Sequence, residues 1–388
     1  MDSKPTRRIA VFSSSRADYS HLYWVLQALE ATPSLEPALI LFGAHLAPEF
    51  GTTGDQVGAD GVRVAARIES LLSSDTDVGM AKSMGVSMLG LADALAELRP
   101  DLCLVIADRY EMLAAGAAAM ALRIPIVHVE GGEVSRGAVD DAVRNALTKL
   151  AHVHLAPHAE AAARIRAMGE EPWRIHDVGA PSLDHLQRSE RIARATLLGQ
   201  LGLPAAQPLA VVALHPVTLE ADTLGECDAV FAALAAVAGS ILFCFPNADA
   251  GSRALIERAR RFCEDRADAT LRINLPAPTY FSALAAADLM LGNSSSGIME
   301  SASFRLPTVD IGRRQEGRHA AANIIRVPAD RDAIVAAVAR ARSKAFRSGL
   351  EGLRNPYGDG NAGERIAAIL ADLPGRNALL DKAPAPLS

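Results

Sequence analysis

The sequence predicts an α/β protein with parallel sheets, arranged in two similar halves. Short apolar runs rich in β-branched residues recur along the 388 residues, and Ala- and Leu-rich helical segments separate them. Strands that alternate with helices in this way form parallel sheets. A charged helical connector divides the runs into two series, and the length also favours two domains.

The first series of predicted strands occupies the front half: "RIAVFSSS", "PALILFGAH", "RVAARI", "LCLVIAD", "PIVHVEGG" and "AHVHLAPH". The second series follows the connector: "LAVVALHP", "ILFCFPNAD", "TLRINLP", "LMLGNSSSG", "PTVDIG" and "NIIRVP". Periodicity breaks at "GAPSLD", between the two series. We therefore expect an N-terminal domain over residues 1–182, a C-terminal domain over residues 183–360, and a last segment over residues 361–388.

Composition and charge narrow the class of protein. With 50% hydrophobic and 22% charged residues, the chain can bury large cores. The formal net charge is -6 and no Lys/Arg run exceeds a pair, so the footprint of a nucleic-acid-binding protein is absent from the sequence. The Ala-rich stretch "MLAAGAAAMALRIPIVHV" is interrupted by an arginine and a proline, and the N-terminus has no signal-peptide pattern. We therefore expect a cytoplasmic protein without a membrane span.

The cysteines indicate neither a metal site nor a disulfide framework. They are widely spaced, with no CxxC pair and no histidine spacing typical of zinc. We expect buried reduced thiols at Cys103, Cys227, Cys244 and Cys263. Neither half contains GxGxxG or GxxxxGKS/T, so ordinary dinucleotide and P-loop sites lose their main support.

Functional residues are expected in the loops after the strands, because ligands of open α/β sheets bind at the carboxyl ends of the strands. After the first strand, "SSSRADYS" offers hydroxyl groups and the cation Arg16, although a Ser-rich helix cap explains the same residues. "ADRYEMLAAG" places Asp108 and Arg109 directly after "LCLVI". The alternative there is an N-cap aspartate beside a surface arginine.

A group of carboxylates follows the next strand, in "HVEGGEVSRGAVDDAVRNALTK": Glu130, Glu133, Asp140 and Asp141. Two adjacent glycines let the backbone approach a ligand closely, and either aspartate also fits the N-cap of the following helix. Carboxylates so close together repel one another unless some are protonated, paired to an arginine or used in catalysis. The candidate arginine partners are Arg16, Arg109 and Arg144.

The second half carries an anion-binding pattern. "LMLGNSSSGIMESASF" is a strand, a turn with Ser294, Ser295 and Gly297, and then a helix, so hydroxyl groups and free backbone N–H groups gather where a phosphate could bind. Glu300 lies one turn further on, within reach of the ribose of the same nucleotide. The alternative is a serine N-cap with a capping-box-like acid.

Three further loops add candidates in this half. "ALHPVT" places His215 after a strand, "FPNADAGS" places Asn247 similarly, and "DIGRRQEGR" contains Arg314 among other arginines. A lone histidine at a strand end is more often structural than catalytic. Its neighbourhood of anion-binding features favours a functional role here.

Taken together, these motifs resemble the hydrolysing UDP-N-acetylglucosamine 2-epimerases, in order and in approximate spacing, over about residues 7–330. The motifs are "SSSRADYS", "ADRYEMLAA", "HVEGGEVSRGAVDDAVRNALTKLAHVH", "VGAPSLD", "HPVT", "FPNADAGS", "GNSSSGIMESASF" and "GRRQEGR". The resemblance implies the GT-B architecture: two Rossmann-like domains with the nucleotide sugar in the cleft between them. It also implies a C-terminal helix that packs back on the N-terminal domain, for which "NAGERIAAILADL" is the candidate.

The resemblance implies an elimination that removes the C2 proton while UDP leaves C1, followed by addition of water to the resulting 2-acetamidoglucal. Asp108, Glu130 and Asp140 match the family's catalytic positions. The predicted catalytic residues are Asp108, Glu130, Asp140 and His215. The predicted substrate-binding residues are Arg16, Ser20, Arg109, Glu133, Asn247, Ser294, Ser295, Gly297, Glu300 and Arg314. No cofactor or metal is expected, the partner is a UDP-sugar, and the family's habit implies a homo-oligomer, either dimer or tetramer.

Several alternatives stay open. Non-hydrolysing epimerases typically carry "HVEAGLR" and a "GDT" loop where this chain has "HVEGGEV" and "ADRYE", which favours the hydrolysing branch. Ala107 departs from the family, which usually has glycine before the Asp-Arg pair. The expected sugar is N-acetylglucosamine, released as N-acetylmannosamine for sialic acid synthesis. The alternative is the same chemistry on 2,4-diacetamido-2,4,6-trideoxyglucose, the legionaminic acid precursor. A GT-B glycosyltransferase and a non-catalytic nucleotide-sugar sensor are more distant alternatives.

Overall fold

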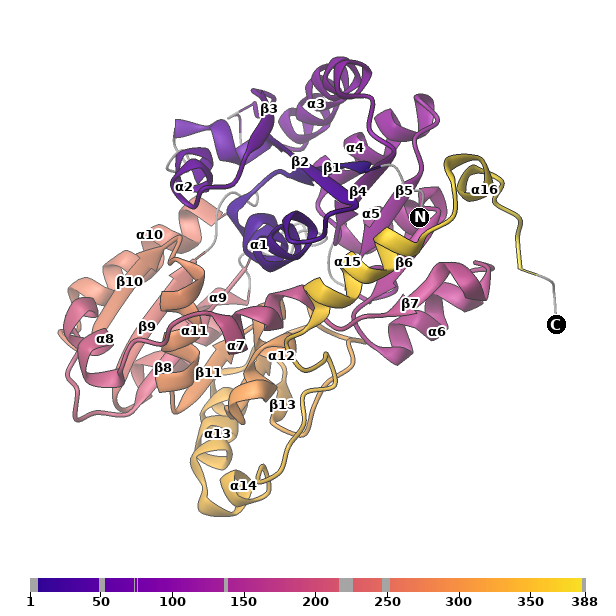
Figure 1. The fold of residues 1–388 in the computed structure, drawn as a ribbon. Helices are drawn as coiled ribbons and strands as arrows, with labels where there is room; N and C mark the ends of the chain where they lie inside the picture. The colour runs from indigo at the N-terminus through magenta and orange to yellow at the C-terminus, as the bar shows by residue number, and fades with distance from the viewer. Residues whose placement is uncertain are drawn as a thin grey trace. The chain divides into compact units, whose positions relative to one another are not determined.

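The computed structural model describes residues 6–48, 53–72, 74, 76–135, 139–215, 226–245 and 252–385 (Figure 1). Contacts between Cα atoms divide the chain into two compact units. Unit 1 comprises Met1–Glu133, Asp140–Asp184 and Tyr357–Ser388, and unit 2 comprises Val134–Val139 and His185–Pro356. Each unit contains one parallel sheet, as the alternation of strands and helices predicts.

The sheet of unit 1 has seven strands in the order β3-β2-β1-β4-β5-β6-β7, all parallel. Its strands are β1 (Arg7–Ser13), β2 (Leu35–Phe42), β3 (Val64–Ile68), β4 (Leu102–Ile106), β5 (Ile126–Val129), β6 (Val153–Ala156) and β7 (Ile175–Asp177). Every residue of β4, β5 and β6 is buried, as expected for strands covered on both faces. Strand β7 is missing from the predicted series, because its three residues, "IHD", carry no apolar pattern.

The helices of unit 1 are α1 (Arg16–Glu30), α2 (Thr53–Ala59), α3 (Asp77–Leu98), α4 (Tyr110–Ala121), α5 (Asp140–Leu150), α6 (Ala159–Ala167), α15 (Ala362–Asp372) and α16 (Arg376–Leu380), with 3-10 turns η1 (Gly43–Leu46), η3 (Pro172–Arg174) and η4 (Pro181–Asp184). Helix α15 packs on α1, where a Cβ added to Gly363 would lie only 2.8 Å from the carbonyl oxygen of Trp24. The carboxylate of Asp184 accepts hydrogen bonds from the backbone N–H groups of Ala362 and Gly363, at 2.8 and 2.7 Å. Asp184 therefore caps α15 from a distant part of the sequence.

The sheet of unit 2 has six parallel strands in the order β10-β9-β8-β11-β12-β13. They are β8 (Leu209–Ala213), β9 (Ser240–Phe245), β10 (Ala269–Ile273), β11 (Leu289–Gly292), β12 (Thr308–Ile311) and β13 (Ile324–Val327). The helices are α7 (His185–Arg188), α8 (Arg194–Leu201), α9 (Cys227–Ala235), α10 (Ser252–Glu264), α11 (Ala277–Ala286), α12 (Ser295–Met299), α13 (Arg331–Arg342) and α14 (Lys344–Ser348), with the 3-10 turn η5 (Ser301–Phe304). Both sheets reverse their strand order beside the first strand, between β1 and β4 and between β8 and β11. Ligands of such folds bind at this point.

Strand β8 shows how unit 2 is packed. Ala210 and Val212 belong to one buried cluster, whereas Leu209 and Val211, which point to the other face, belong to another. Strand β8 is therefore buried on both faces, and its side chains cannot meet a ligand except at the strand end. This confines the search for a site to the loops.

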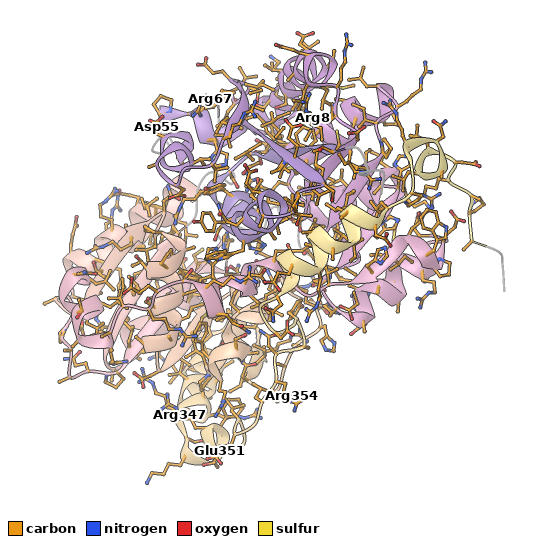
Figure 2. The ribbon with its side chains drawn as sticks, in the orientation of Figure 1. Arg8, Asp55, Arg67, Arg347, Glu351 and Arg354 are labelled. Carbon is orange, nitrogen blue, oxygen red and sulfur yellow. The ribbon has the colours of Figure 1, made fainter. Side chains whose placement is uncertain are left out.

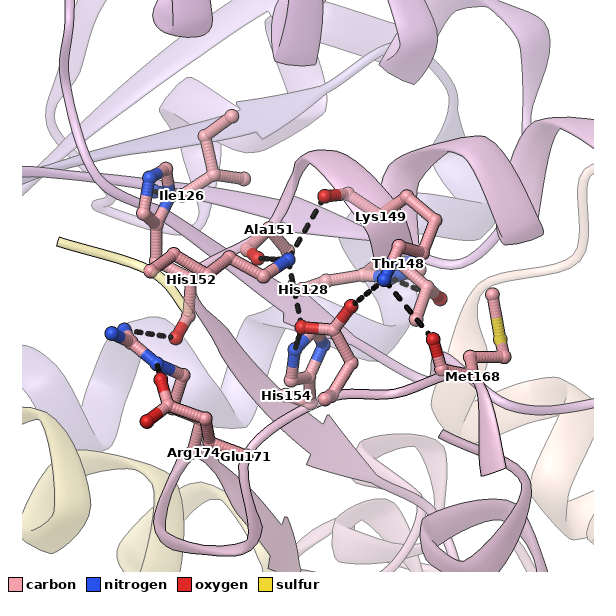
Figure 3. A network of polar contacts seen from close by, with 12 residues as sticks. Ile126, His128, Thr148, Lys149, Ala151, His152, His154, Met168, Glu171 and Arg174 are labelled. Atoms are coloured by element: carbon pink, nitrogen blue, oxygen red, sulfur yellow. Dashed lines mark hydrogen bonds and ion pairs between the residues drawn. The ribbon is translucent and has the colours of Figure 1, made fainter. Parts of the chain in front are cut away.

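An ion cluster around the buried side chains of Glu170 and His154 holds the C-terminal segment on the rest of unit 1 (Figure 3). The carboxylate of Glu170 accepts from Lys149 Nζ at 2.5 Å and from Lys382 Nζ at 2.7 Å, and His154 Nε2 lies 3.1 Å from it. Burial alone would raise the pKa of Glu170, but the hydrogen bonds from His154, Lys149 and Lys382 lower it to about 2. Arg174 adds hydrogen bonds to the carbonyl oxygens of Leu379 and Asp381, so the segment after α15 is fixed by charge as well as by packing.

Exposed charges on both units mix the two signs (Figure 2). In unit 2, the exposed Glu351 lies between the exposed Arg347 and Arg354 in the sequence. In unit 1, Arg8 Nε lies 3.1 Å from the carboxylate of Glu36. Exposed pairs of this kind contribute between about 0 and 1 kcal/mol each, so the fold depends on burial rather than on them.

The cysteines are free thiols, three of them buried, whereas Cys263 is partly exposed. The expectation of a buried thiol is therefore wrong for Cys263. In the part of the chain that the structure describes, no helix is long and apolar enough to cross a membrane. Within the same residues, no three His, Cys, Asp or Glu side chains are grouped so as to hold a metal ion.

Candidate functional site

Strands β4 and β5 end in the same unusual way. The residue after each strand, Ala107 and Glu130, has a left-handed backbone, with φ of 55° and 62°. Each is still hydrogen-bonded into the sheet, Ala107 N–H to Val129 O and Glu130 N–H to Leu155 O, both at 2.9 Å. The chain therefore turns sharply at the carboxyl edge of the sheet. One strained residue, Ala107, directly precedes the predicted catalytic residue Asp108, and the other, Glu130, is itself one.

Asp108 follows the first of these turns and is ion-paired to Arg144 of α5. Arg144 is only 1% exposed, and its Nη1 also donates to Glu133 O at 3.1 Å and to Asp141 Oδ1 at 3.4 Å. The alternative interpretation of Asp108 as an N-cap is wrong, because α4 begins at Tyr110 and Arg109 occupies the cap position. Arg144 thus neutralises the charge of Asp108, a predicted catalytic acid, and connects Asp108 to the loop after β5 and to the start of α5.

Asp140 is the first residue of α5 and Asp141 the second. Both lie in the first turn, where the partial positive charge of a helix N-terminus favours carboxylates. The pairing of Asp141 with Arg144 spans three residues of the helix. Asp140 is therefore held next to the Asp108–Arg144 pair by the helix itself.

Glu130 is buried, with 5% of its surface exposed, and its carboxylate oxygens lie 3.1 and 3.3 Å from Nδ1 of His21 on α1. His21 is absent from the residues predicted from sequence. No local pattern marks it, since it is simply one polar position of a helix. Its partnership with Glu130, which is 109 residues away, depends on the packing of α1 beside β5.

Glu133 anchors the loop that carries Glu130. His158 Nδ1 accepts from Ala161 N–H at the start of α6, so in the neutral ring Nε2 carries the proton and donates to Glu133 Oε1. Tyr357 O–H donates to Glu133 Oε2 at 3.2 Å. All three side chains are buried. A contact between Glu133 and the substrate stays a prediction. The hydrogen bonds from His158 and Tyr357 give Glu133 a structural role as well, because they fix the loop after β5.

The Ser-rich turn after β1 is a helix cap, as the alternative interpretation of that motif holds. Ser15 accepts from Asp18 N–H, and the Asp18 carboxylate accepts in return from Ser15 N–H at 3.0 Å. Arg16 is the first residue of α1, and Ser20 lies one turn later on the same face. Burial lowers the pKa of Arg16 to about 10, which leaves the guanidinium charged at neutral pH.

Arg109 donates to the buried carboxylate of Glu111 at 3.1 Å. Burial raises the pKa of Glu111, and the charge of Arg109 opposes that rise. The neighbouring residues Asp108 and Arg109 are therefore both paired to buried side chains of opposite charge, Arg144 and Glu111. Asp108 and Arg109 are adjacent in the chain and opposite in charge, yet each is paired to a different side chain.

In unit 2, the turn after β11 has the expected serine cap. Ser294 accepts from Ser296 N–H at 3.4 Å, and Tyr280 O–H donates to Ser296 Oγ at 2.6 Å. Ser295 is the first residue of α12. The short helix ends at Met299, so Glu300 is its C-cap and is buried at 4% exposure. The interpretation of Glu300 as a capping-box acid is wrong for this reason.

Gly297 has a packing reason to be glycine. A Cβ added there would lie 3.2 Å from Thr308 Cγ2 of β12, so α12 lies close to the sheet. Gly292 is still more constrained: its φ is 136°, and a Cβ would lie 1.9 Å from Ala213 O. Gly292 lets the end of β11 lie against the last residue of β8, and Gly297 lets α12 pack against the first residue of β12.

His215 follows β8 and is held by Asn293. The Asn293 side chain accepts from His215 N–H at 2.7 Å and donates to His215 O at 2.8 Å. Arg314 Nη1 donates to Asn293 O at 3.1 Å, and Gln315 Nε2 donates to the same oxygen at 2.9 Å. Sequence reasoning missed Asn293 and Gln315 as site residues, although both lie inside the quoted motifs.

One pocket of unit 2 is lined by both His215 and Asn293. Among the described residues, its lining is Leu214, His215, Glu226, Cys227, Val230, Asn293 and Ile311. Arg318 lies in the loop between β12 and β13. Its guanidinium donates to Val134 O at 3.2 Å and to Ser135 Oγ at 3.3 Å, and these residues also belong to unit 2. The predicted residue Asn247 lies outside the described residues.

Each unit gathers charged and polar side chains at the carboxyl ends of its strands. Unit 1 gathers Asp108 and the start of α5 around one buried arginine, with Glu130 at the end of the adjacent strand. Unit 2 gathers hydroxyl groups, a histidine and an arginine at the ends of β8, β11 and β12. The first set suits proton transfer, and the second suits an anion.

Comparisons with known proteins agree with this chemistry. A family model described as UDP-N-acetylglucosamine 2-epimerase matches residues 27–371. The chain is 34% identical over 377 residues to the Legionella pneumophila UDP-N,N'-diacetylbacillosamine 2-epimerase (hydrolyzing), a match that covers 97% of this chain and 98% of that protein. It is 32% identical over 322 residues to the Neisseria meningitidis UDP-N-acetylglucosamine 2-epimerase, covering 82% of this chain and 83% of that protein.

A solved structure of S. aureus MnaA with UDP has a TM-score of 0.81 to this chain at 17% identity, and the match covers 99% of this chain and 100% of that one. At this identity the likeness shows the fold alone. The expected fold class, α/β with two Rossmann-like domains of the GT-B type, is confirmed.

Proposed function

The chain belongs to the hydrolysing UDP-N-acetylglucosamine 2-epimerase family, and from that premise we propose that it converts a UDP-2-acetamido sugar and water into UDP and the free sugar inverted at C2. The observation that carries the proposal is the Asp108–Arg144 pair. A carboxylate at a strand end, compensated by a buried arginine that also reaches the loop after β5, is the arrangement that a proton-transfer site needs.

The proposed reaction has two steps. A carboxylate takes the C2 proton while the C1–O bond to UDP breaks and both of its electrons leave with UDP, which gives a 2-acetamidoglucal. A carboxyl group then gives a proton to C2 on the opposite face, and water bonds to C1 through its oxygen and loses one proton to a carboxylate. Asp108, Glu130 and Asp140 are the proposed acids and bases, because proton removal and return need carboxyl groups in different environments. The sequence involves no net redox change, so the proposal includes no nicotinamide.

UDP is the proposed leaving group held by unit 2. Arg314, His215 and the turn of Ser294 and Ser295 are suited to the charge that develops on the diphosphate, and Glu300 is suited to the ribose hydroxyls. The other proposed substrate-binding residues are Arg16, Ser20 and Arg109 in unit 1 and Gly297 in unit 2. The proposal requires no metal, because arginine and hydroxyl groups take the place of one in neutralising a leaving phosphate.

The favoured sugar is 2,4-diacetamido-2,4,6-trideoxyglucose, which is N,N'-diacetylbacillosamine. The L. pneumophila relative named for this substrate matches 97% of the chain at 34% identity. N-acetylglucosamine is the second candidate, because the N. meningitidis relative named for it is 32% identical. The product would serve a legionaminic acid pathway in the first case and a sialic acid pathway in the second.

A side-by-side assay tests the function and the sugar. Each UDP-sugar is incubated alone with the protein, and UDP and free sugar are quantified. Equal amounts of UDP and the C2-inverted sugar, unaffected by a chelator, are expected, with the higher kcat/KM for the diacetamido substrate. Accumulation of the UDP-linked epimer would indicate a non-hydrolysing enzyme. Turnover that needs an added acceptor would indicate a glycosyltransferase, and UDP binding without turnover would indicate a sensor.

We also propose a cytoplasmic homo-oligomer. The support lies on α3, where Val78, Val86 and Leu89 are exposed and share one side of the helix. Leu89 is 72% exposed and Val78 63%. An apolar stripe of this kind on a helix is a common feature of surfaces that meet another copy of the chain.

A further inference from the structure

We infer that Asn293 is a positioning residue of the UDP-binding site, holding His215 through its side chain and Arg314 through its main chain. The inference rests on the proposed function, because it is there that His215 and Arg314 are assigned to the diphosphate. Asn293 itself is not proposed to touch the reacting atoms.

The side chain of Asn293 is fully committed to one partner. Its amide oxygen and its amide nitrogen bond to the backbone N–H and C=O of His215, at 2.7 and 2.8 Å. The two bonds reproduce the pairing of two strands, made between residues 78 positions apart and beyond the last ladder residues of β8 and β11. With 4% exposure, the amide has little access to water as a substitute.

The main chain of Asn293 holds the second predicted ligand. Its carbonyl oxygen accepts from Arg314 at 3.1 Å and from Gln315 at 2.9 Å, both in the loop after β12. Asn293 N–H donates to Ala213 O at 3.2 Å, on the strand that precedes His215. One residue therefore connects the ends of three strands, β8, β11 and β12, and the loops from two of them carry His215 and Arg314.

Only the amide of asparagine or glutamine offers an acceptor and a donor side by side to the backbone N–H and C=O of one residue, and asparagine has the shorter reach. Aspartate keeps the acceptor for His215 N–H but puts a second oxygen opposite His215 O. Alanine removes both bonds. The loss of order at His215 should therefore grow from the aspartate to the alanine variant, whereas a residue that only fills space would show no such grading.

The test measures UDP binding by calorimetry in the whole chain. Asn293→Ala should raise the Kd for UDP about tenfold, and Asn293→Asp should raise it by a smaller factor. Asn323→Ala is the matched control. Asn323 is also buried, and its amide nitrogen donates to Ser301 Oγ and Leu306 O, both at 2.8 Å, at the amino ends of the strands. The control should lower Tm similarly while leaving the Kd within about twofold of the wild type.

A double-mutant cycle shows whether Asn293 acts through its partners. In a variant that already carries His215→Ala and Arg314→Ala, the further change Asn293→Ala should alter the Kd by less than about twofold. A full tenfold loss in that background would overturn the inference, and so would unchanged UDP binding by the single variant. If the wild type binds no UDP, the proposed function fails and the inference fails with it. Should Asn293→Ala not fold, Asn293→Asp gives the same decision in both backgrounds.

Discussion

Asp108, whose side chain is 19% exposed, and the buried Arg144 form an ion pair between the end of β4 and the second turn of α5, across 36 residues of sequence. The same guanidinium holds the carbonyl oxygen of Glu133, so the acid and the loop after β5 share one support. A buried charge is costly unless it is compensated, and each member of this pair provides the compensation for the other. The two predicted catalytic acids nearest this arginine in sequence, Asp140 and Glu130, lie at the start of its helix and in the loop that it holds.

Replacing the proposed catalytic acids should impair turnover without weakening the binding of UDP. We expect Asp108→Asn and Glu130→Gln to lower kcat by about 100-fold or more, because each removes a group that transfers a proton. The Kd for UDP should stay within about threefold of the wild type, since UDP is assigned to unit 2. Glu160→Gln, which removes an exposed carboxylate paired to Arg164, is the control and should keep full turnover. Undiminished turnover in both test variants would remove these carboxylates from the mechanism.

The left-handed backbone of Ala107 predicts a stabilising substitution. A residue with a Cβ at φ 55° is strained by roughly 1–2 kcal/mol, and glycine removes that strain at a cost of roughly 0.5–1 kcal/mol in unfolded-state entropy. Ala107→Gly should therefore raise the free energy of unfolding by up to about 1 kcal/mol, measured by urea denaturation. The same change inside α4, Ala117→Gly, should lower it by about 1 kcal/mol. Two destabilised variants would show that no strain is stored at Ala107.

The cluster around Glu170 predicts acid sensitivity. The pKa of Glu170 is lowered to about 2, below its ordinary value of 4.5, so the stability it contributes is complete above about pH 4.5 and is lost as the pH falls toward 2. The shift corresponds to about 3 kcal/mol in the free energy of unfolding. Burial also lowers the pKa of His154 below its ordinary value of 6.5. This shift likewise makes the protein less stable as the pH falls, and its effect begins at a higher pH than that of Glu170. Glu170→Gln should lose the part of the acid dependence that lies below pH 4.5, as measured by denaturation between about pH 7 and pH 3.

The control for this experiment is Glu160→Gln, whose carboxylate is 48% exposed in its pair with Arg164. Its pH dependence should follow that of the wild type, because an exposed pair contributes little. If Glu170→Gln and the wild type lose stability in parallel below pH 4.5, the buried cluster is not the source of acid sensitivity.

The apolar stripe on α3 predicts the effect of a charge on assembly. Leu89→Glu should shift the molar mass measured by light scattering toward the monomer, because a carboxylate buried against a second copy costs several kcal/mol. Ile273→Glu, on β10 of unit 2, introduces the same charge at a side chain that is 44% exposed and should leave the mass unchanged. A wild-type protein that is already monomeric would contradict the proposed oligomer.

Much of the fold could be predicted from the order of apolar runs. β1 to β6 and β8 to β13 lie within the predicted series, because a short apolar run between two helical segments is a local signal. β7 could not be found, since a three-residue edge strand is defined by its pairing with β6 and not by its composition. Among site residues, the serine turn at Ser294 was predictable because a cap and a helix start are both local.

The sequence by itself determined every described strand except β7, the loops that follow those strands, and the acids, serines and arginines that the loops carry. Only the tertiary structure decided which of these groups are paired: Arg144 with Asp108, His21 with Glu130, Tyr357 with Glu133, and Asn293 with His215. The reason is physical. The spacing of apolar residues can be read from the sequence alone. A buried polar group, in contrast, pairs with a residue of whichever element packs against it, and that residue can lie anywhere in the sequence.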